Sequence, residues 1–156
     1  MKLTHMTQKE ITLNTAGWWG DFLFFTDCDS NYGKIKYELE IDEDEILACE
    51  NISFSDLVDE EVEQLAQIIN LQTGVSLDLE LVQNLLAENI SLYNVSEVSQ
   101  FYIDDAALYA DYSVEQQSLT AKAAKKMGYS AVAINDEFGK SYMIDVNVYF
   151  NQLVRA

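Results

Sequence analysis

The chain has 156 residues, of which 49% are apolar, a size and composition that suit one globular domain and argue against intrinsic disorder. Its 27 acidic residues against 9 Lys and Arg give a formal net charge of −18, and a surface so negative repels phosphate backbones. Direct nucleic-acid binding is therefore disfavoured. The charge suits either simple solubility or attraction of basic proteins, including those that themselves bind DNA or RNA.

No targeting or membrane segment is predicted. The first ten residues contain no apolar signal segment, and no apolar run approaches the roughly 20 residues needed to span a bilayer. Cys28 and Cys49 fit no Cys-x-x-Cys pattern, so we expect both thiols to be reduced and partly buried. These features favour a cytoplasmic protein.

Strands are expected in the first part of the chain, residues 1–53. Residues 22–26 form a short aromatic run that is typical of a buried strand. In residues 35–41 apolar and charged side chains alternate, which predicts a strand with one exposed face. Residues 46–49 can form a further strand.

Helices are expected in the middle part, residues 54–112. Ser55 can cap a first helix, and Gly74 marks a break after it. The apolar side chains expected on the inner face of this helix are Leu57, Val58, Val62, Leu65, Ile68 and Ile69. A second helix is predicted over residues 77–88, with Leu81, Leu85 and Leu86 facing inward. Residues 90–112 fit no single pattern, although 105–112 can form a helical turn.

The last part begins with a predicted helix and returns to strands. Ser113 and Gln116 form a capping box, and Gly128 is expected to end the helix that it opens. Residues 130–135 and 141–148 are predicted strands, joined by a turn at residues 136–139.

Common nucleotide and metal motifs are absent or incomplete. No Gly-x-Gly-x-x-Gly follows a strand, no phosphate-binding loop occurs, and a single histidine, His5, excludes a two-histidine zinc site. A calcium-like pattern is formed by Asp27, Asp29, Asn31 and Glu38. However, Tyr32 occupies the position where that loop requires glycine, and the flanks read as strands. No metal site is therefore predicted.

Three short segments, taken in order, carry a resemblance. His5-Met6-Thr7 lies on the first expected strand, Gly20 to Thr26 leads into the aromatic run, and Ser30-Asn31-Tyr32-Gly33 follows. Together they resemble the ADP-ribosyltransferase fold, in which a His-Gly-Thr or His-Gly-Ser strand precedes a glycine-rich loop, an aromatic strand and an Asn-Tyr pair.

The last part of the chain narrows the resemblance. Lys126 to Val132, followed by Asp136-Glu137-Phe138-Gly139 and Lys140-Ser141-Tyr142, is similar to the phage anti-CRISPR ADP-ribosyltransferases that act on type I-F CRISPR complexes. The resemblance implies an α+β fold of split antiparallel sheets with a helical middle segment. We expect one domain over residues 1–156, with a helical insert at about 54–112.

The resemblance also implies roles for individual residues. Asp136, with Glu137 as the second choice, would stabilise the positive charge that develops on the ribose when the nicotinamide bond of NAD breaks. The rings of Phe24 and Tyr32 would hold the nicotinamide. His5 would bind the ribose, Thr7 would steady the strand, and the backbone of Met6 would bind the carboxamide.

Other interpretations remain open from the residues alone. A lone histidine is often incidental, aromatic runs are often core, and an Asp-Glu-x-Gly turn is often only a hairpin. Two departures from the family also matter. Met6 replaces a glycine, and Ser141 stands where many relatives carry the catalytic glutamate.

The implied function is mono-ADP-ribosyl transfer from NAD, in the cytoplasm of a host cell if the protein is phage-encoded. The implied partner is the basic DNA-recognition subunit of a type I-F CRISPR complex, where an asparagine is the acceptor in the resembling subgroup. Two alternatives are an acidic DNA mimic that blocks such a partner without catalysis and a toxin that modifies another host protein.

Overall fold

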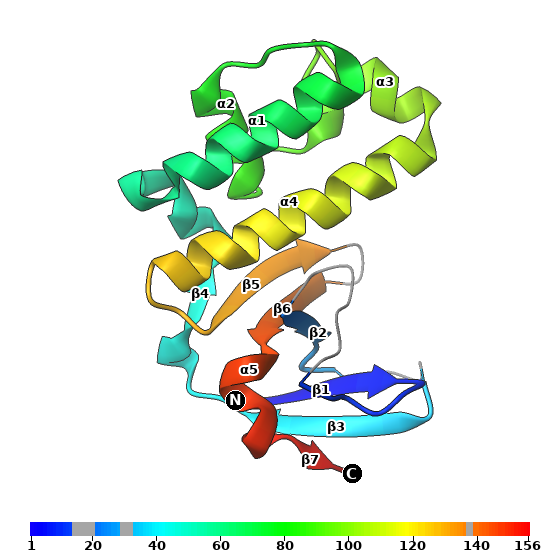
Figure 1. Cartoon of the computed structure of the whole chain (residues 1–156), viewed down its shortest axis with the longest axis vertical. Helices are drawn as coiled ribbons and strands as arrows, with labels where there is room; N and C mark the ends of the chain where they lie inside the picture. Colours follow the sequence, from blue (N-terminus) through cyan, green and yellow to red (C-terminus); the bar gives the residue numbers. More distant parts are fainter. Residues whose placement is uncertain (14–20, 29–32, 137–138) are drawn as a thin grey trace. The chain divides into compact units, whose positions relative to one another are not determined.

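The computed structural model of the chain describes residues 1–13, 21–28, 33–136 and 139–156, which form two compact units (Figure 1). Unit 1 contains Met1–Ala48 and Gly128–Ala156, and unit 2 contains Cys49–Met127. Among the described residues, no helix combines the length and the apolar character that crossing a lipid bilayer requires.

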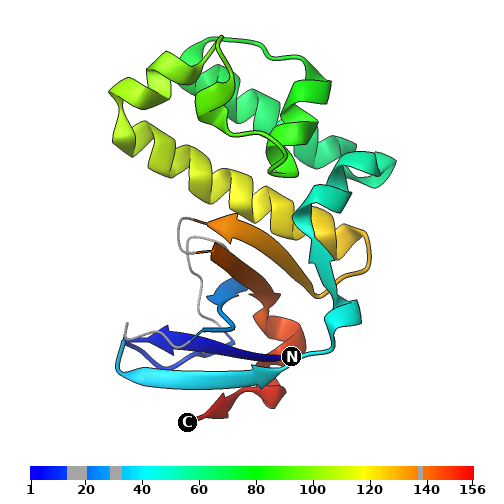
Figure 2. The same cartoon turned by 180° about the vertical axis from the view of Figure 1, so that it is seen from behind.

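Unit 1 contains two sheets, seen from both sides in Figures 1 and 2. The first has the order β1-β3-β7 and consists of β1 (Lys2–Thr7), β3 (Ile35–Glu40) and β7 (Val154–Arg155). The second has the order β2-β6-β5-β4 and consists of β2 (Phe22–Phe25), β6 (Gly139–Asp145), β5 (Ala131–Asp136) and β4 (Ile46–Ala48). All neighbours are antiparallel except β4 and β5. The expected α+β fold with split antiparallel sheets is confirmed.

Among the described residues, one isolated bridge, between Thr4 and Thr26, pairs the backbones of the two sheets. The Thr4 N–H donates to the Thr26 carbonyl at 2.8 Å, and the Thr26 N–H donates to the Thr4 carbonyl at 2.9 Å. The Thr4 hydroxyl also reaches the carbonyl of Cys28 at 3.2 Å. The edge of β1 is therefore fixed to the end of β2 at this one bridge.

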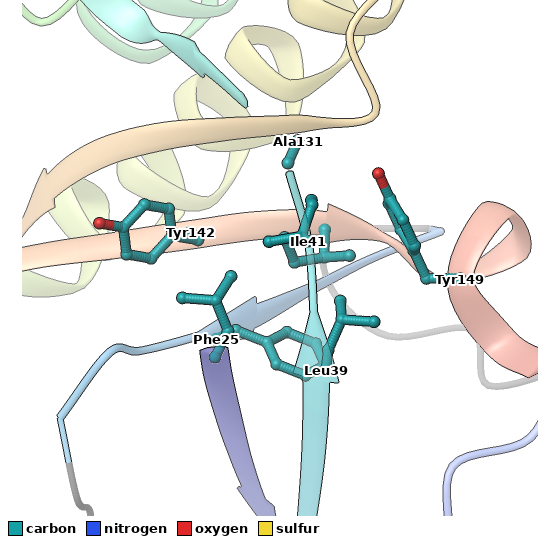
Figure 3. Packing of buried hydrophobic residues seen from close by; sticks show 8 residues of the cluster. Phe25, Leu39, Ile41, Ala131, Tyr142 and Tyr149 are labelled. Carbon is teal, nitrogen blue, oxygen red and sulfur yellow. The ribbon is translucent and has the colours of Figure 1, made fainter. Parts of the chain in front are cut away.

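The core of unit 1 fills the space between the sheets (Figure 3). Its buried members are Leu3, Phe25, Leu39, Ile41, Ala131, Tyr142, Ile144 and Tyr149. They come from both sheets, from Ile41 just after β3, and from the short helix α5 (Val146–Tyr149). Full burial of each leucine or phenylalanine contributes roughly 1.5–3 kcal/mol, so this cluster holds the two sheets together.

Short turns complete unit 1. Two 3₁₀ helices lie in the described part of unit 1: η1 (Glu43–Glu45) precedes β4, and η5 (Phe150–Gln152) precedes β7. The Tyr149 hydroxyl donates to Glu45 at 2.8 Å. The predicted strand over residues 141–148 is too long, because the Asp145 carboxylate accepts the Asn147 N–H at 3.0 Å and caps α5.

Unit 2 is helical. Its elements are η2 (Cys49–Phe54), η3 (Asp56–Val58), α1 (Asp59–Thr73), α2 (Leu79–Leu86), η4 (Leu92–Asn94), α3 (Ser99–Asp104) and α4 (Ala106–Lys126). Gly74 ends α1 in the left-handed conformation, as expected, and Asp78 caps α2 through the Glu80 N–H at 2.9 Å. The Ser55 side chain caps η3 rather than α1, so Leu57 lies in a 3₁₀ turn and is 60% exposed, contrary to expectation.

The long helix α4 begins earlier than predicted. Asp105 caps it by accepting the Leu108 N–H at 3.1 Å, so the helix already runs through Ser113. The predicted capping box is wrong because the Gln116 side chain has another role. It is buried and bonds Thr120 at 3.0 Å, while Thr120 donates to the Leu86 carbonyl at 2.7 Å. These two polar side chains satisfy the end of α2.

The two cysteines are free, as expected, but differ in burial: Cys49 is buried, whereas Cys28 is exposed. Burial and the nearby carboxylates of Glu88 and Glu50 raise the pKa of the Cys49 thiol far above its usual range, so this thiol is unreactive.

The close approach of Gly33 to β1 generates a stability prediction. An added Cβ at Gly33 would lie 2.7 Å from the Thr7 nitrogen, whereas at Gly128 it would meet nothing within 4 Å. Both glycines have nearly the same positive φ, +96° and +95°. Ala at either position adds about 1–3 kcal/mol of backbone strain, so the difference between the variants isolates the clash.

We expect Gly33→Ala to lose at least about 1 kcal/mol more unfolding free energy than Gly128→Ala, from the cost of overpacking. Urea unfolding followed by circular dichroism measures both. Equal losses would show that the end of β1 yields to the extra methyl group.

Candidate active site

His5 is held by the neighbouring strand. Its Nδ1 lies 2.6 Å from the carbonyl oxygen of Phe24, and its ring centre lies 5.2 Å from that of Phe25. Because a carbonyl only accepts, Nδ1 carries the proton and donates. In the neutral ring Nε2 is then an acceptor, which can receive a hydrogen bond from a hydroxyl group.

The surroundings of His5 favour this neutral form. Burial lowers the pKa of His5 below its usual 6.5, and the hydrogen bond to Phe24 opposes part of that effect. A neutral imidazole with one fixed tautomer is suited to binding a sugar hydroxyl and is less suited to carrying charge.

The edge of β1 opens one step beyond the bridge between the sheets. Because Thr4 pairs with Thr26, continued antiparallel pairing would bring Met6 opposite Phe24. Instead the Phe24 carbonyl binds the His5 side chain. Backbone groups two residues apart point to the same edge of a strand, so the Met6 N–H and C=O face the opening. One donor and one acceptor side by side match a carboxamide.

A hollow of about 220 Å³ lies at this opening. Its lining consists of Thr4, His5, Met6, Phe24, Phe25, Thr26 and Ser141. Phe24 is half-buried, whereas Phe25 is 1% exposed and belongs to the core. Of the two neighbouring rings, Phe24 is therefore the one that can contact a ligand. The hollow suits one ring and its sugar rather than a whole dinucleotide.

Asp136 is linked to this hollow through the β5–β6 ladder. Ser141 lines the hollow and pairs with Ile134, and two pairs further along the ladder Asp136 is opposite Gly139. In the ladder, the backbone of Asp136 therefore lies two residue pairs from Ser141, which lines the hollow. Glu137 and Tyr32, the other two predicted site residues, lie outside the described residues.

Thr7, at the end of β1, binds two neighbouring segments. Its hydroxyl accepts the Lys9 N–H at 3.3 Å, and its carbonyl accepts the Lys34 N–H at 2.9 Å. Of the predicted site residues, His5, Met6 and Phe24 line the first hollow, whereas Thr7 does not. Sequence reasoning missed Thr4 and Thr26 as wall residues, although Thr4 adjoins His5 and Thr26 lies two residues from Phe24.

A second hollow, of about 300 Å³, adjoins the first and shares His5 and Met6 with it. The remaining lining residues are Thr7, Gln8, Lys9, Glu10, Ile11 and Leu23. Two of these lining residues, Glu10 and Ile11, bind residues outside the hollow. The Ile11 N–H donates to the buried Tyr37 hydroxyl at 3.2 Å, and Glu10 forms an ion pair with Arg155.

Within the described part of the chain, no three His, Cys, Asp or Glu side chains lie close enough to hold a metal ion. Glu38, one member of the calcium-like pattern, is paired with Lys2 at 2.8 Å and with Lys36 at 3.4 Å.

Comparisons with known proteins agree with this fold. The model of the family described as "Anti-CRISPR Type I-F ADP-ribosyltransferase AcrIF11" matches residues 12–152. A solved structure described as "Crystal structure of an anti-CRISPR protein" superimposes with a TM-score of 0.55, at 19% identity, over 92% of this chain and 88% of that one. At that identity the likeness shows a shared fold. No curated protein matches the chain.

The resemblance drawn from short sequence segments is therefore confirmed over most of the chain. The family match includes Phe24, Asp136 and Ser141 and begins after His5, Met6 and Thr7. The enzymes of this family use NAD as their co-substrate. The chain belongs to the anti-CRISPR type I-F ADP-ribosyltransferases, and its activity is mono-ADP-ribosyl transfer.

Proposed function

We propose that the chain transfers ADP-ribose from NAD to the DNA-recognition subunit of a type I-F CRISPR complex, and that the two hollows beside β1 bind NAD. The observation that carries the site is the parting of Met6 from Phe24, which leaves backbone donor and acceptor groups beside a neutral imidazole. The acidic charge of −18 supports a basic partner.

Each residue of the site has a defined task in this proposal. The Met6 backbone binds the carboxamide, and the faces of Phe24 and Tyr32 hold the nicotinamide ring. His5 Nε2 accepts a hydrogen bond from a ribose hydroxyl group. Thr7 keeps the end of β1 in place. The binding groups are uncharged, so they do not oppose the positive charge that develops on the sugar.

The reaction needs a carboxylate near that sugar. Nicotinamide leaves with the bonding electron pair, and the ribose carbon becomes positively charged, as in glycoside hydrolysis. Asp136, with Glu137 as the second candidate, stabilises this charge. An amide nitrogen of the acceptor then bonds to the ribose carbon and loses a proton. The product carries a bulky diphosphate group, which blocks DNA by its size and its negative charge.

A transfer assay tests the role of Asp136. Purified chain at a substoichiometric amount is mixed with NAD and a type I-F complex, and the subunits are weighed by intact mass spectrometry. We expect one subunit to gain one ADP-ribose, and Asp136→Asn to slow this gain by about 10²–10³-fold, the usual cost of losing one group that stabilises a transition state.

Two comparisons sharpen that assay. Glu63→Gln removes a charge from an exposed residue of α1 and should leave the rate unchanged. If Glu137→Gln is inactive while Asp136→Asn is active, the catalytic role belongs to Glu137. Loss of DNA binding without any mass gain would contradict transfer and favour an acidic DNA mimic.

The role of His5 predicts a pH effect. The pKa of His5 is lower in the folded chain than in the unfolded chain, where it has its usual value of 6.5. Between these two pKa values the unfolded chain therefore binds more protons than the folded chain. The free energy of unfolding and the affinity for NAD should both reach their full values above pH 6.5 and decrease as the pH falls below 6.5. His5→Asn keeps a donor for the Phe24 carbonyl and removes Nε2, since an asparagine amide nitrogen stands at the position of Nδ1.

We therefore expect His5→Asn to unfold at nearly the same urea concentration as the parent at pH 7.5, while its KM for NAD rises about tenfold, the cost of one hydrogen bond. His5→Leu should unfold at a lower urea concentration than the parent and should also have a raised KM for NAD. Since the chain has one histidine, the fall in stability below pH 6.5 should flatten in His5→Asn. A KM unchanged in His5→Asn would remove His5 from the site.

A further inference from the structure

Four lysines surround the first sheet, and the structure divides them into two pairs. Lys2 and Lys36 both bind Glu38 through their ammonium groups, at 2.8 Å and 3.4 Å. Among the described residues, no carboxylate pairs with the ammonium group of Lys9 or of Lys34. On a chain of charge −18, two cations that have no acidic partner among the described residues mark a place where an anion is tolerated.

Lys9 and Lys34 belong to different segments and meet at the end of β1. The N–H of Lys9 donates to the Thr7 hydroxyl, and the N–H of Lys34 donates to the Thr7 carbonyl. Gly33 packs against the Thr7 backbone, so the second segment approaches β1 as closely as its chain allows. The backbones of the two exposed lysines are therefore bound to the same residue, Thr7.

The second hollow lies beside this pair. Lys9 contributes to its lining, and it shares His5 and Met6 with the hollow assigned to the nicotinamide end. The acidic residue in its wall, Glu10, is neutralised by Arg155 of β7. Tyr37 of β3 holds the adjacent Ile11. Within the described part of the chain, the wall thus presents a lysine without an acidic partner, while its carboxylate, Glu10, pairs with Arg155.

We infer that Lys9 and Lys34 form the diphosphate-binding site for NAD, and that Arg155 positions this site by holding Glu10 away from it. The inference deepens the proposed function and depends on it. It fixes the direction of the dinucleotide, with nicotinamide in the first hollow and the diphosphate and adenosine toward the second. Lys9 and Arg155 lie outside residues 12–152, so the family match does not assign them.

Electrostatics explains why this chain needs the pair. Each phosphate of the diphosphate carries one negative charge, and the field of the chain as a whole opposes it. Local hydrogen bonds from an ammonium group to phosphate are roughly twice as strong as neutral ones. The neutral form of His5 is favoured, and Lys2 and Lys36 are paired with Glu38. None of these three residues therefore supplies a positive charge for the diphosphate.

Binding of ADP-ribose, which has the diphosphate and cannot react, tests the site without the transfer step. Titration calorimetry is carried out on the parent chain, Lys9→Gln, Lys34→Gln and the double variant, with inorganic diphosphate as a second probe. We expect each single variant to bind ADP-ribose at least about threefold more weakly and the double variant at least about tenfold more weakly, as for exposed charged pairs. Inorganic diphosphate should compete with ADP-ribose on the parent chain only.

The matched control is Lys2→Gln, which removes the same charge from the other end of β1 and should bind ADP-ribose within twofold of the parent. Arg155→Gln should weaken binding, and adding Glu10→Gln should restore it, which a purely structural role of Arg155 would not produce. Unchanged affinity in the double lysine variant would overturn the inference, and transfer by the parent chain would show that the proposed function stands without it. A parent chain that binds no ADP-ribose would overturn both.

Discussion

The structure of the site depends on the point where β1 and β2 stop pairing. At Thr4 and Thr26 the two strands exchange both backbone hydrogen bonds, and one step further the Phe24 carbonyl is bound by a side chain instead of by Met6. The His5 ring therefore ends the pairing. The backbone bonds between Thr4 and Thr26 join the sheets, and the hollow lies just beyond them, where His5 rather than Met6 binds the Phe24 carbonyl. This arrangement also explains how methionine can replace the usual glycine, since the proposed ligand contacts at this position come from the backbone.

The chain separates the tasks of folding and binding along each strand. In β1, Leu3 is in the core, Thr4 joins the sheets, His5 ends the pairing and Thr7 anchors two neighbouring segments. In β2, Phe25 packs in the core while Phe24 lines the hollow. The alternation of a strand allows such close placement, because adjacent side chains point to opposite faces. Substitutions at adjacent positions should therefore have different effects, on stability at one and on NAD at the next.

Local patterns in the sequence predicted what depends on local rules. The alternation at residues 35–41, the left-handed end of α1 at Gly74 and the hairpin of β5 and β6 follow from period and turn chemistry. Errors arose where a distant partner decides the structure. Gln116 resembles a capping residue, yet its amide serves the end of α2. The order of the motifs predicted His5, Met6, Thr7 and Phe24 as site residues, and His5, Met6 and Phe24 line one hollow. No local pattern connects Lys9 to Lys34 or Glu10 to Arg155, which lie far apart in sequence.

The most direct test of the account is the response of individual backbone amides to nicotinamide. In ¹⁵N–¹H spectra recorded at pH 7.5, titration with nicotinamide should shift the Met6 amide strongly, while the Thr4 amide, bound to Thr26, should move little. The ¹⁵N signals of His5 should show a protonated Nδ1 and an unprotonated Nε2 throughout. A Met6 amide that stays in place while amides elsewhere shift would contradict the central claim that the open edge of β1 receives the nicotinamide.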